Sequence, residues 1–440
     1  MAVLCARFVS LGAAAVQLPL LTRTLPPEQY GAVALAMALS TYFALASAEP
    51  ATLAFQRHPG EPHHDSSYAY ALGRVVPGIV AVSMIVVGVA FIFGEQDTGI
   101  AVAGWGAGLA VARYTATAWL MWGRHWSYAV NLMLSTGLRT IVLATVVLAG
   151  VPGLPALALA GLVSALISLI LAPKVSWSRL WGEPRPWPRS LGYLLAGASL
   201  GVTVLTSSNI VALGIAAGPN VTAEFAAMSQ LSMYTTAAIV SMVLTVMYPH
   251  VRRIWDLDQH RSANRLMQRA QLTVVFVGTG SISTLTALDG ILTELIVPAD
   301  LVDLSALTVL LLASTFAGLG QVSGWQLQLR LRARALVIRT TAAAIFGVVV
   351  LVALLGATDL RPVLTAAYGT LFGFVLYFAL VRGRGGWRGP SLNVLTFGLL
   401  ALAVVAPFAS AGALSASALS LASVAALVAF ISRKARLDAL

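Results

Sequence analysis

Long apolar segments alternate with short polar interruptions over the whole chain. A helix needs about 20 apolar residues to cross the hydrocarbon core of a bilayer. Segments of this length recur fourteen times, at approximately 2–21, 30–55, 75–94, 99–122, 128–150, 153–172, 191–214, 222–248, 272–297, 303–326, 335–356, 362–381, 391–410 and 412–431. The pattern therefore predicts an all-α integral membrane protein with about 14 transmembrane helices.

Composition agrees with this class. Of the 440 residues, 58% are hydrophobic and 10% are charged, whereas soluble domains carry about a quarter charged residues. The first apolar stretch is followed directly by further spans and has no small-residue cleavage site, so we expect it to be retained as the first span. The single cysteine, Cys5, excludes an intrachain disulfide.

The basic residues are distributed unevenly between the loops. Alternate loops and the C-terminal tail hold 21 of the 27 Lys and Arg residues, while the intervening loops hold only Arg23 and Arg361 among several acids. By the positive-inside rule, both termini are expected in the cytoplasm of a bacterium, with the chain in the inner membrane. The net charge of +11 is then a topology signal, and no nucleic acid partner is needed to explain it.

A Pro- and Trp-rich interruption after the sixth span divides the chain into two halves. We expect an N-lobe at 1–175 (six spans), a cytoplasmic linker at 176–190, a C-lobe at 191–384 (six spans), and the last two helices with the tail at 385–440. The halves match weakly at an offset of 192 residues, through the pairs Pro27 and Pro219, Ala34 and Ala226, Leu39 and Leu231, Ser40 and Ser232, and Tyr42 and Tyr234. This match predicts two six-helix lobes in a pseudo-twofold repeat, an arrangement typical of secondary transporters.

The turn after the first span reads Leu21-Thr22-Arg23-Thr24-Leu25-Pro26-Pro27-Glu28-Gln29-Tyr30-Gly31. It resembles the "L-x-R-x-L-x-P-x-x-Y-G" turn of Wzx-type polysaccharide flippases, in the multidrug/oligosaccharidyl-lipid/polysaccharide (MOP) superfamily. A second resemblance runs from Ser208 to Gly214, through Gly218-Pro219 and Phe225-Ala226-Ala227, to Tyr248-Pro249. The resemblance implies a flippase for an undecaprenyl-diphosphate-linked oligosaccharide, with a cationic central cavity and a possible proton or sodium gradient. We expect a monomer and no cofactor.

Two arginines lie deep within predicted spans. Arg113 lies about 13 Å and Arg139 about 12 Å from the cytoplasmic ends of their helices, at 1.5 Å per residue. Ionisable residues at such depth usually face a cavity and have a function, although pairing with a neighbouring helix is the alternative. The planar guanidinium suits a diphosphate, because it binds two oxygens at once and stays charged.

Five further residues complete the candidate set. Arg7 and Arg23 join the cationic residues that would bind the diphosphate, with snorkelling to the interface as the plainer reading of Arg7. Glu49, beside Pro50, is expected to pair with Arg7 or to carry a proton. Asp289 is a candidate for ion coupling, or an acid wetted by the outer interface. Asn209 stands where many relatives of this resemblance carry an aspartate, so coupling here must use another residue or another route.

Other functions fit the sequence less well. An ion-coupled multidrug or small-molecule exporter of the same superfamily is the main alternative, but it predicts buried carboxylates for cationic drugs. A polymerase or ligase would need a sizeable outer loop, and every outer loop here is short, so no enzyme activity is expected. The Asp256-Leu257-Asp258 and His63-His64-Asp65 strings are too short to indicate a metal site, and no phosphate-binding GxxxxGK loop is present.

Overall fold

A computed structural model describes residues 2–57, 66–173, 189–330, 332–357, 361–382 and 390–437. Within these ranges every regular element is a helix, which is the structure that satisfies its own backbone hydrogen bonds in lipid. The chain divides into two compact units, Met1–Ala223 and Glu224–Leu440. Most of the predicted 176–190 linker and all of His63-His64-Asp65 lie outside the described residues, and the predicted lobe boundaries stay predictions.

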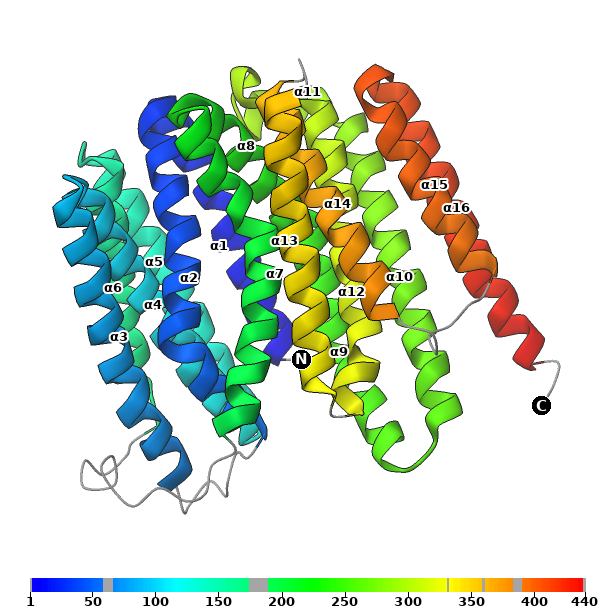
Figure 1. The fold of residues 1–440 in the computed structure, drawn as a ribbon, viewed down its shortest axis with the longest axis horizontal. Helices are drawn as coiled ribbons and strands as arrows, with labels where there is room; N and C mark the ends of the chain where they lie inside the picture. The colour runs from blue at the N-terminus through cyan, green and yellow to red at the C-terminus, as the bar shows by residue number, and fades with distance from the viewer. Residues whose placement is uncertain are drawn as a thin grey trace. The chain divides into compact units, whose positions relative to one another are not determined.

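The first unit contains seven helices and the start of an eighth (Figure 1): α1 (Ala2–Thr24), α2 (Pro27–Arg57), α3 (Ser66–Ile92), α4 (Gln96–Met121), α5 (His125–Leu148), α6 (Gly153–Ile170), α7 (Arg189–Ala216) and α8 (Pro219–Ser232). Glycines in the left-handed region close two of its turns. Gly123 (φ +70°) separates α4 from α5, and Gly150 (φ +85°) precedes α6.

Helix α4 is the centre of the first unit, because it packs against α2, α3, α5 and α6. Its closest approach is to α6: a Cβ added to Gly108 would lie 2.5 Å from the carbonyl oxygen of Gly161, and one added to Gly104 would lie 2.8 Å from that of Ala158. Small residues therefore let these two backbones touch, as membrane helix pairs often require. The Gly104 to Gly108 spacing therefore marks close helix packing within this unit.

The second unit continues from α8 through a π-helix (Met233–Ala237) into α9 (Ala238–Asp256). Its other long helices are α10 (His260–Ala287), α12 (Leu304–Leu329), α13 (Ala333–Ala357), α14 (Pro362–Arg382), α15 (Pro390–Val405) and α16 (Ala411–Leu437). Between α10 and α12 lie the short α11 (Asp289–Ile291), a π-helix (Leu292–Ile296) and a 3-10 turn (Ala299–Leu301). Helix α10 therefore stands where the span at 272–297 was expected. It begins twelve residues before the expected start, at His260, and ends ten residues before the expected end, at Ala287.

Helix α12 is the centre of the second unit and packs against α9, α10, α13, α14 and α15. The last two helices form a hairpin (red in Figure 1), and α16 lies along α10. Ser283 Oγ on α10 donates to the Ser415 carbonyl at 3.1 Å, and the Tyr368 hydroxyl on α14 donates to the Ala403 carbonyl at 2.8 Å. The C-terminal hairpin is therefore fastened to the second unit by polar contacts on two sides.

One serine contact occurs in both units. Ser40 Oγ on α2 donates to the Val102 carbonyl of α4 at 3.2 Å. Ser232 Oγ at the end of α8 donates to the Leu310 carbonyl of α12 at 3.0 Å. Ser40 and Ser232 are a pair in the 192-residue sequence match, and each bonds to the central helix of its own unit. The local packing is thus repeated where the sequence repeats.

Ten helices of the described residues are long and apolar enough to cross a membrane, so the chain is a multi-pass membrane protein. Four predicted spans are not among the ten. Helix α4 is rich in buried Gly, Ala and Thr, which lowers its hydropathy because it faces protein. Within the residues whose side chains are described, the last two spans contribute the apolar stretches Leu395–Phe408 and Ala411–Val424. The count of fourteen stays a prediction.

The polar interruption at 249–271 is helical over most of its length. Helix α9 continues to Asp256 and α10 begins at His260, with Asp258 in the left-handed region (φ 56°) between them. Apolar residues at helical spacing explain this extension: Val251, Ala263 and Met267 are all buried. Because these residues are buried, both helices extend beyond the ends of the expected spans.

Candidate functional site

The ionisable groups that the sequence singles out in the first unit meet between α2 and α4. Arg113 Nη2 donates to Glu49 Oε1 at 2.8 Å. The Glu49 side chain is 2% exposed, whereas the Arg113 side chain is 54% exposed. The carboxylate is therefore covered and neutralised, and the guanidinium keeps an accessible side. Glu49 was expected to pair with Arg7 or to carry a proton. The structure pairs it with Arg113, and the side chain of Arg7 lies outside the described part.

Arg139 occupies a second position in this unit. It lies 14 residues from the start of α5, or about 21 Å along the axis, which is deeper than the sequence estimate because the helix begins at His125. Its guanidinium carbon lies 4.4 Å from the ring centroid of Trp105 on α4. A cation over an aromatic face is stabilised by the ring quadrupole. Arg139 is thus held between two helices while remaining partly exposed.

Neutral polar groups join the same helices in the buried part of the unit. Gln17 Nε2 on α1 donates to Thr140 Oγ1 on α5 at 2.7 Å, and Thr115 Oγ1 on α4 donates to Asn131 Oδ1 on α5 at 3.3 Å. All four are buried, and Asn131 Nδ2 has no partner among the described residues. Sequence reasoning missed Gln17 and Asn131, although an amide inside an apolar span is itself a signal for such a contact.

The remaining predicted residues belong to other helices. Arg7 belongs to α1, but its side chain is outside the described part. Arg23 is exposed in the last turn of α1, and Asn209 is 2% exposed within α7. Asp289 begins α11 in the second unit and is partly exposed. The structure therefore brings Arg113 and Glu49 into contact, whereas Asp289 belongs to the other unit.

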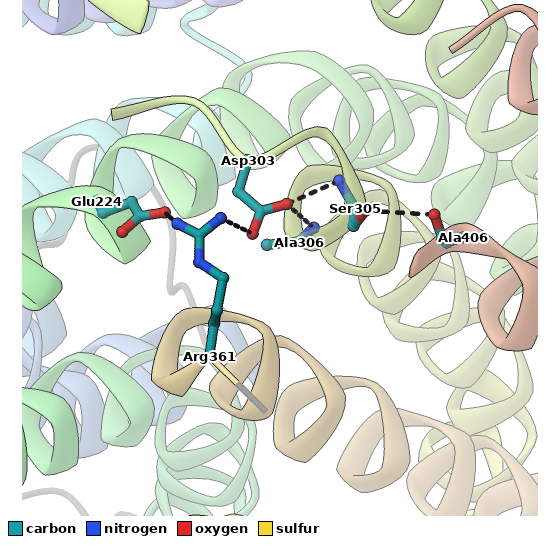
Figure 2. A network of polar contacts seen from close by, with 6 residues as sticks. All are labelled: Glu224, Asp303, Ser305, Ala306, Arg361 and Ala406. Carbon is teal, nitrogen blue, oxygen red and sulfur yellow. Dashed lines mark hydrogen bonds and ion pairs between the residues drawn. The ribbon is translucent and has the colours of Figure 1, made fainter. Parts of the chain in front are cut away.

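A polar network in the second unit escaped the sequence reasoning (Figure 2). Arg361, just before α14, bonds to Glu224 of α8 through Nη2 and to Asp303 through Nη1, the latter at 3.2 Å. Asp303 also caps α12 by accepting from the backbone N–H groups of Ser305 and Ala306. Ser305 Oγ then donates to the Ala406 carbonyl at 3.2 Å. One arginine thus joins the ends of three helices, next to the turn between α15 and α16.

Chemically, these groups can bind a ligand through charge and hydrogen bonds. Among the described residues no three His, Cys, Asp or Glu side chains come together as a metal site would require. The acids of the first unit's helices are either at helix ends or, for Glu49, neutralised by an arginine. The exposed side of the Arg113 guanidinium consequently presents N–H donors, which suit an anion.

No family model and no curated protein sequence matches the chain. Solved structures do. The MATE multidrug transporter DinF-BH, solved as a complex, matches with a TM-score of 0.63 at 13% identity, over 86% of this chain and 93% of that one. The chain has a MATE-like fold. Inward-facing and outward-facing structures of a MATE family transporter of the MOP superfamily match with TM-scores of 0.53 and 0.54, at 13% and 15% identity, over 86–87% of this chain and 93–94% of those chains.

The same fold occurs in transporters that are described as members of the MOP superfamily. They are transporters, and their match extends over nearly the whole length of both chains.

Proposed function

We propose that the protein is a flippase that moves an undecaprenyl-diphosphate-linked oligosaccharide from the cytoplasmic to the outer leaflet. The MATE-like fold supports the transport part, because the same fold occurs in inward-facing and outward-facing transporters. Alternating access between two six-helix lobes in the bacterial inner membrane is the corresponding mechanism. The repeated serine contacts, from Ser40 and from Ser232, support the two-lobe repeat.

The observation that carries the choice of cargo is the Glu49–Arg113 pair. A drug-type exporter of cations needs an accessible carboxylate, but Glu49 is covered and already paired. The accessible partner is the arginine, and Arg139 adds a second partly exposed cation on the neighbouring helix. Charge-assisted bonds from guanidinium groups are well suited to diphosphate oxygens. An anionic lipid headgroup therefore fits these residues better than a cationic drug does.

An ion-coupled multidrug exporter is the second candidate. The structural neighbours favour it, since they are described as multidrug transporters. Glu49 could serve such a protein if the pair with Arg113 opened during transport. Asn209 carries no charge in either case, so a proton or sodium gradient would have to act through another residue.

Deletion of the gene in its own host separates the two candidates. The flippase proposal expects lipid-linked oligosaccharide to accumulate on the cytoplasmic side, glycan export to stop, and susceptibility to cationic drugs to stay unchanged. Complementation with Arg113→Ala or Arg139→Ala should fail to restore export although the protein is inserted. Unchanged glycan export together with increased drug susceptibility would instead establish the exporter.

A further inference from the structure

The α9–α10 hairpin carries a stripe of arginines that the transport proposal does not use. Arg261, Arg265 and Arg269 are spaced by four residues at the start of α10, so they share one side of the helix. All three are exposed, whereas Ala263, Met267 and Ala270 on the other side are buried. The basic side is therefore fixed in direction by the packing of the apolar side.

The hairpin is fastened to the end of α12, which brings a further cation close to it. Arg330 lies over the Trp255 ring at 5.9 Å, and Gln326 Nε2 donates to Asn264 Oδ1 at 3.2 Å. The stripe and the α12–α13 turn consequently belong to one surface. Figure 1 shows the green hairpin reaching past the yellow α12–α13 turn.

The stripe lacks compensating charge. Asp256 is paired with Arg252 of its own helix, and Asp258 lies near His260. None of Arg261, Arg265 and Arg269 forms an ion pair with any residue that the structure describes. A partner for these arginines must therefore bring negative charge from outside this part of the chain.

The position of the stripe matches the headgroup layer of a membrane. Arg269 lies three residues before Leu272, where the apolar run of α10 begins. The three arginines span eight residues, or about 12 Å along the axis. The headgroup layer of one leaflet is about 5–7 Å thick. The backbone of Arg269 therefore lies within this layer, and the long side chains of Arg265 and Arg261 reach back towards it.

We propose that Arg261, Arg265 and Arg269, with Arg330 beside them, bind the phosphate headgroups of anionic phospholipids in the cytoplasmic leaflet. None of these four arginines is among the residues assigned to cargo, and the proposal does not depend on what the cargo is. A purely topological role needs positive charge somewhere in the loop, but it needs neither a helical stripe nor its fastening to α12. Each arginine in contact should raise affinity for an anionic headgroup about fivefold.

Native mass spectrometry of the delipidated full chain can test this, with phosphatidylglycerol and phosphatidylcholine of identical acyl chains as probes. We expect the wild type to bind phosphatidylglycerol at least about tenfold more tightly, and the preference to fade in high salt. Arg261→Gln/Arg265→Gln/Arg269→Gln should lose it. The matched control, Arg124→Gln/Arg252→Gln/Arg253→Gln, removes three other exposed arginines of the basic loops and should keep it.

Three outcomes would overturn the proposal: no preference in the wild type, a preserved preference in the stripe variant, or an equal loss in the control. The last result would mean that net charge alone attracts the lipid. If the triple variant does not fold, Arg265→Gln and Arg269→Gln are compared singly, and each should lower the preference about fivefold. Equal elution profiles and melting temperatures establish that the variants compared are folded.

Discussion

Removal of the Arg113 guanidinium should separate the structural from the transport role of the Glu49–Arg113 pair. In Arg113→Met the Glu49 carboxylate, 2% exposed, loses the partner that lies 2.8 Å away. Breaking a fully buried pair costs about 3–5 kcal/mol. Because the Arg113 side chain is 54% exposed and water can reach it, we expect a smaller loss, about 2 kcal/mol. Glu49→Gln keeps an oxygen that accepts from Arg113 and should cost about 1 kcal/mol.

The double variant Arg113→Met/Glu49→Gln completes the cycle. It has no unpaired charge, so its loss of stability should be smaller than the sum of the two single losses, by about 1–2 kcal/mol. Thermal unfolding in detergent, followed by size-exclusion profile, gives the stability, and glycan export gives transport. If Arg113 binds the cargo, the double variant is stable and inactive while Glu49→Gln remains active. Wild-type export by the double variant would refute the cargo role, and additive losses would refute the pairing.

Three further predictions concern the packing of each unit. Arg361→Gln should lower the melting temperature markedly, because Glu224 and Asp303 lose a shared cation; a change within the error of the unfolding experiment would contradict this. Gly161→Leu should abolish the folded protein, since even a Cβ at this position would overlap the α4 backbone; Gly137→Leu, where nothing lies within 4 Å, is the matched control and should be tolerated. Ser40→Ala and Ser232→Ala should cost similar amounts, about 0.5–1.5 kcal/mol each; markedly unequal losses in thermal unfolding would count against equivalent roles.

Hydrophobic periodicity predicted the helical membrane architecture well, because lipid permits few alternatives to the helix. It was less informative where a helix faces protein rather than lipid. Helix α4 illustrates this: its Gly and Ala residues lower the hydropathy of a segment that is central to the first unit. The extension of α9 and α10 was likewise missed, since polar composition at 249–271 concealed apolar residues at helical spacing.

The candidate site was predicted only in part. Depth within a span identified Arg113, Arg139 and Glu49, because a charge in lipid is costly enough to be informative on its own. The partner of each charged residue could not be predicted in the same way, because Glu49 and Arg113 are 64 residues apart in the sequence. The contacts of Arg361 with Glu224 and Asp303 join positions up to 137 residues apart, at helix ends where charged residues are common. Only the three-dimensional packing distinguishes them from solvated loop residues.

Flipping by the purified protein tests the cargo assignment most directly. The protein is reconstituted into liposomes that contain a fluorescent undecaprenyl-diphosphate-linked sugar, and a membrane-impermeant quencher reports the outer-leaflet fraction over time. We predict that the wild type and Glu49→Gln move the lipid faster than protein-free liposomes do, and that Arg113→Met/Glu49→Gln does not. A lipid-flipping rate equal to that of empty liposomes, from protein that exports a cationic dye in the same vesicles, would contradict the account.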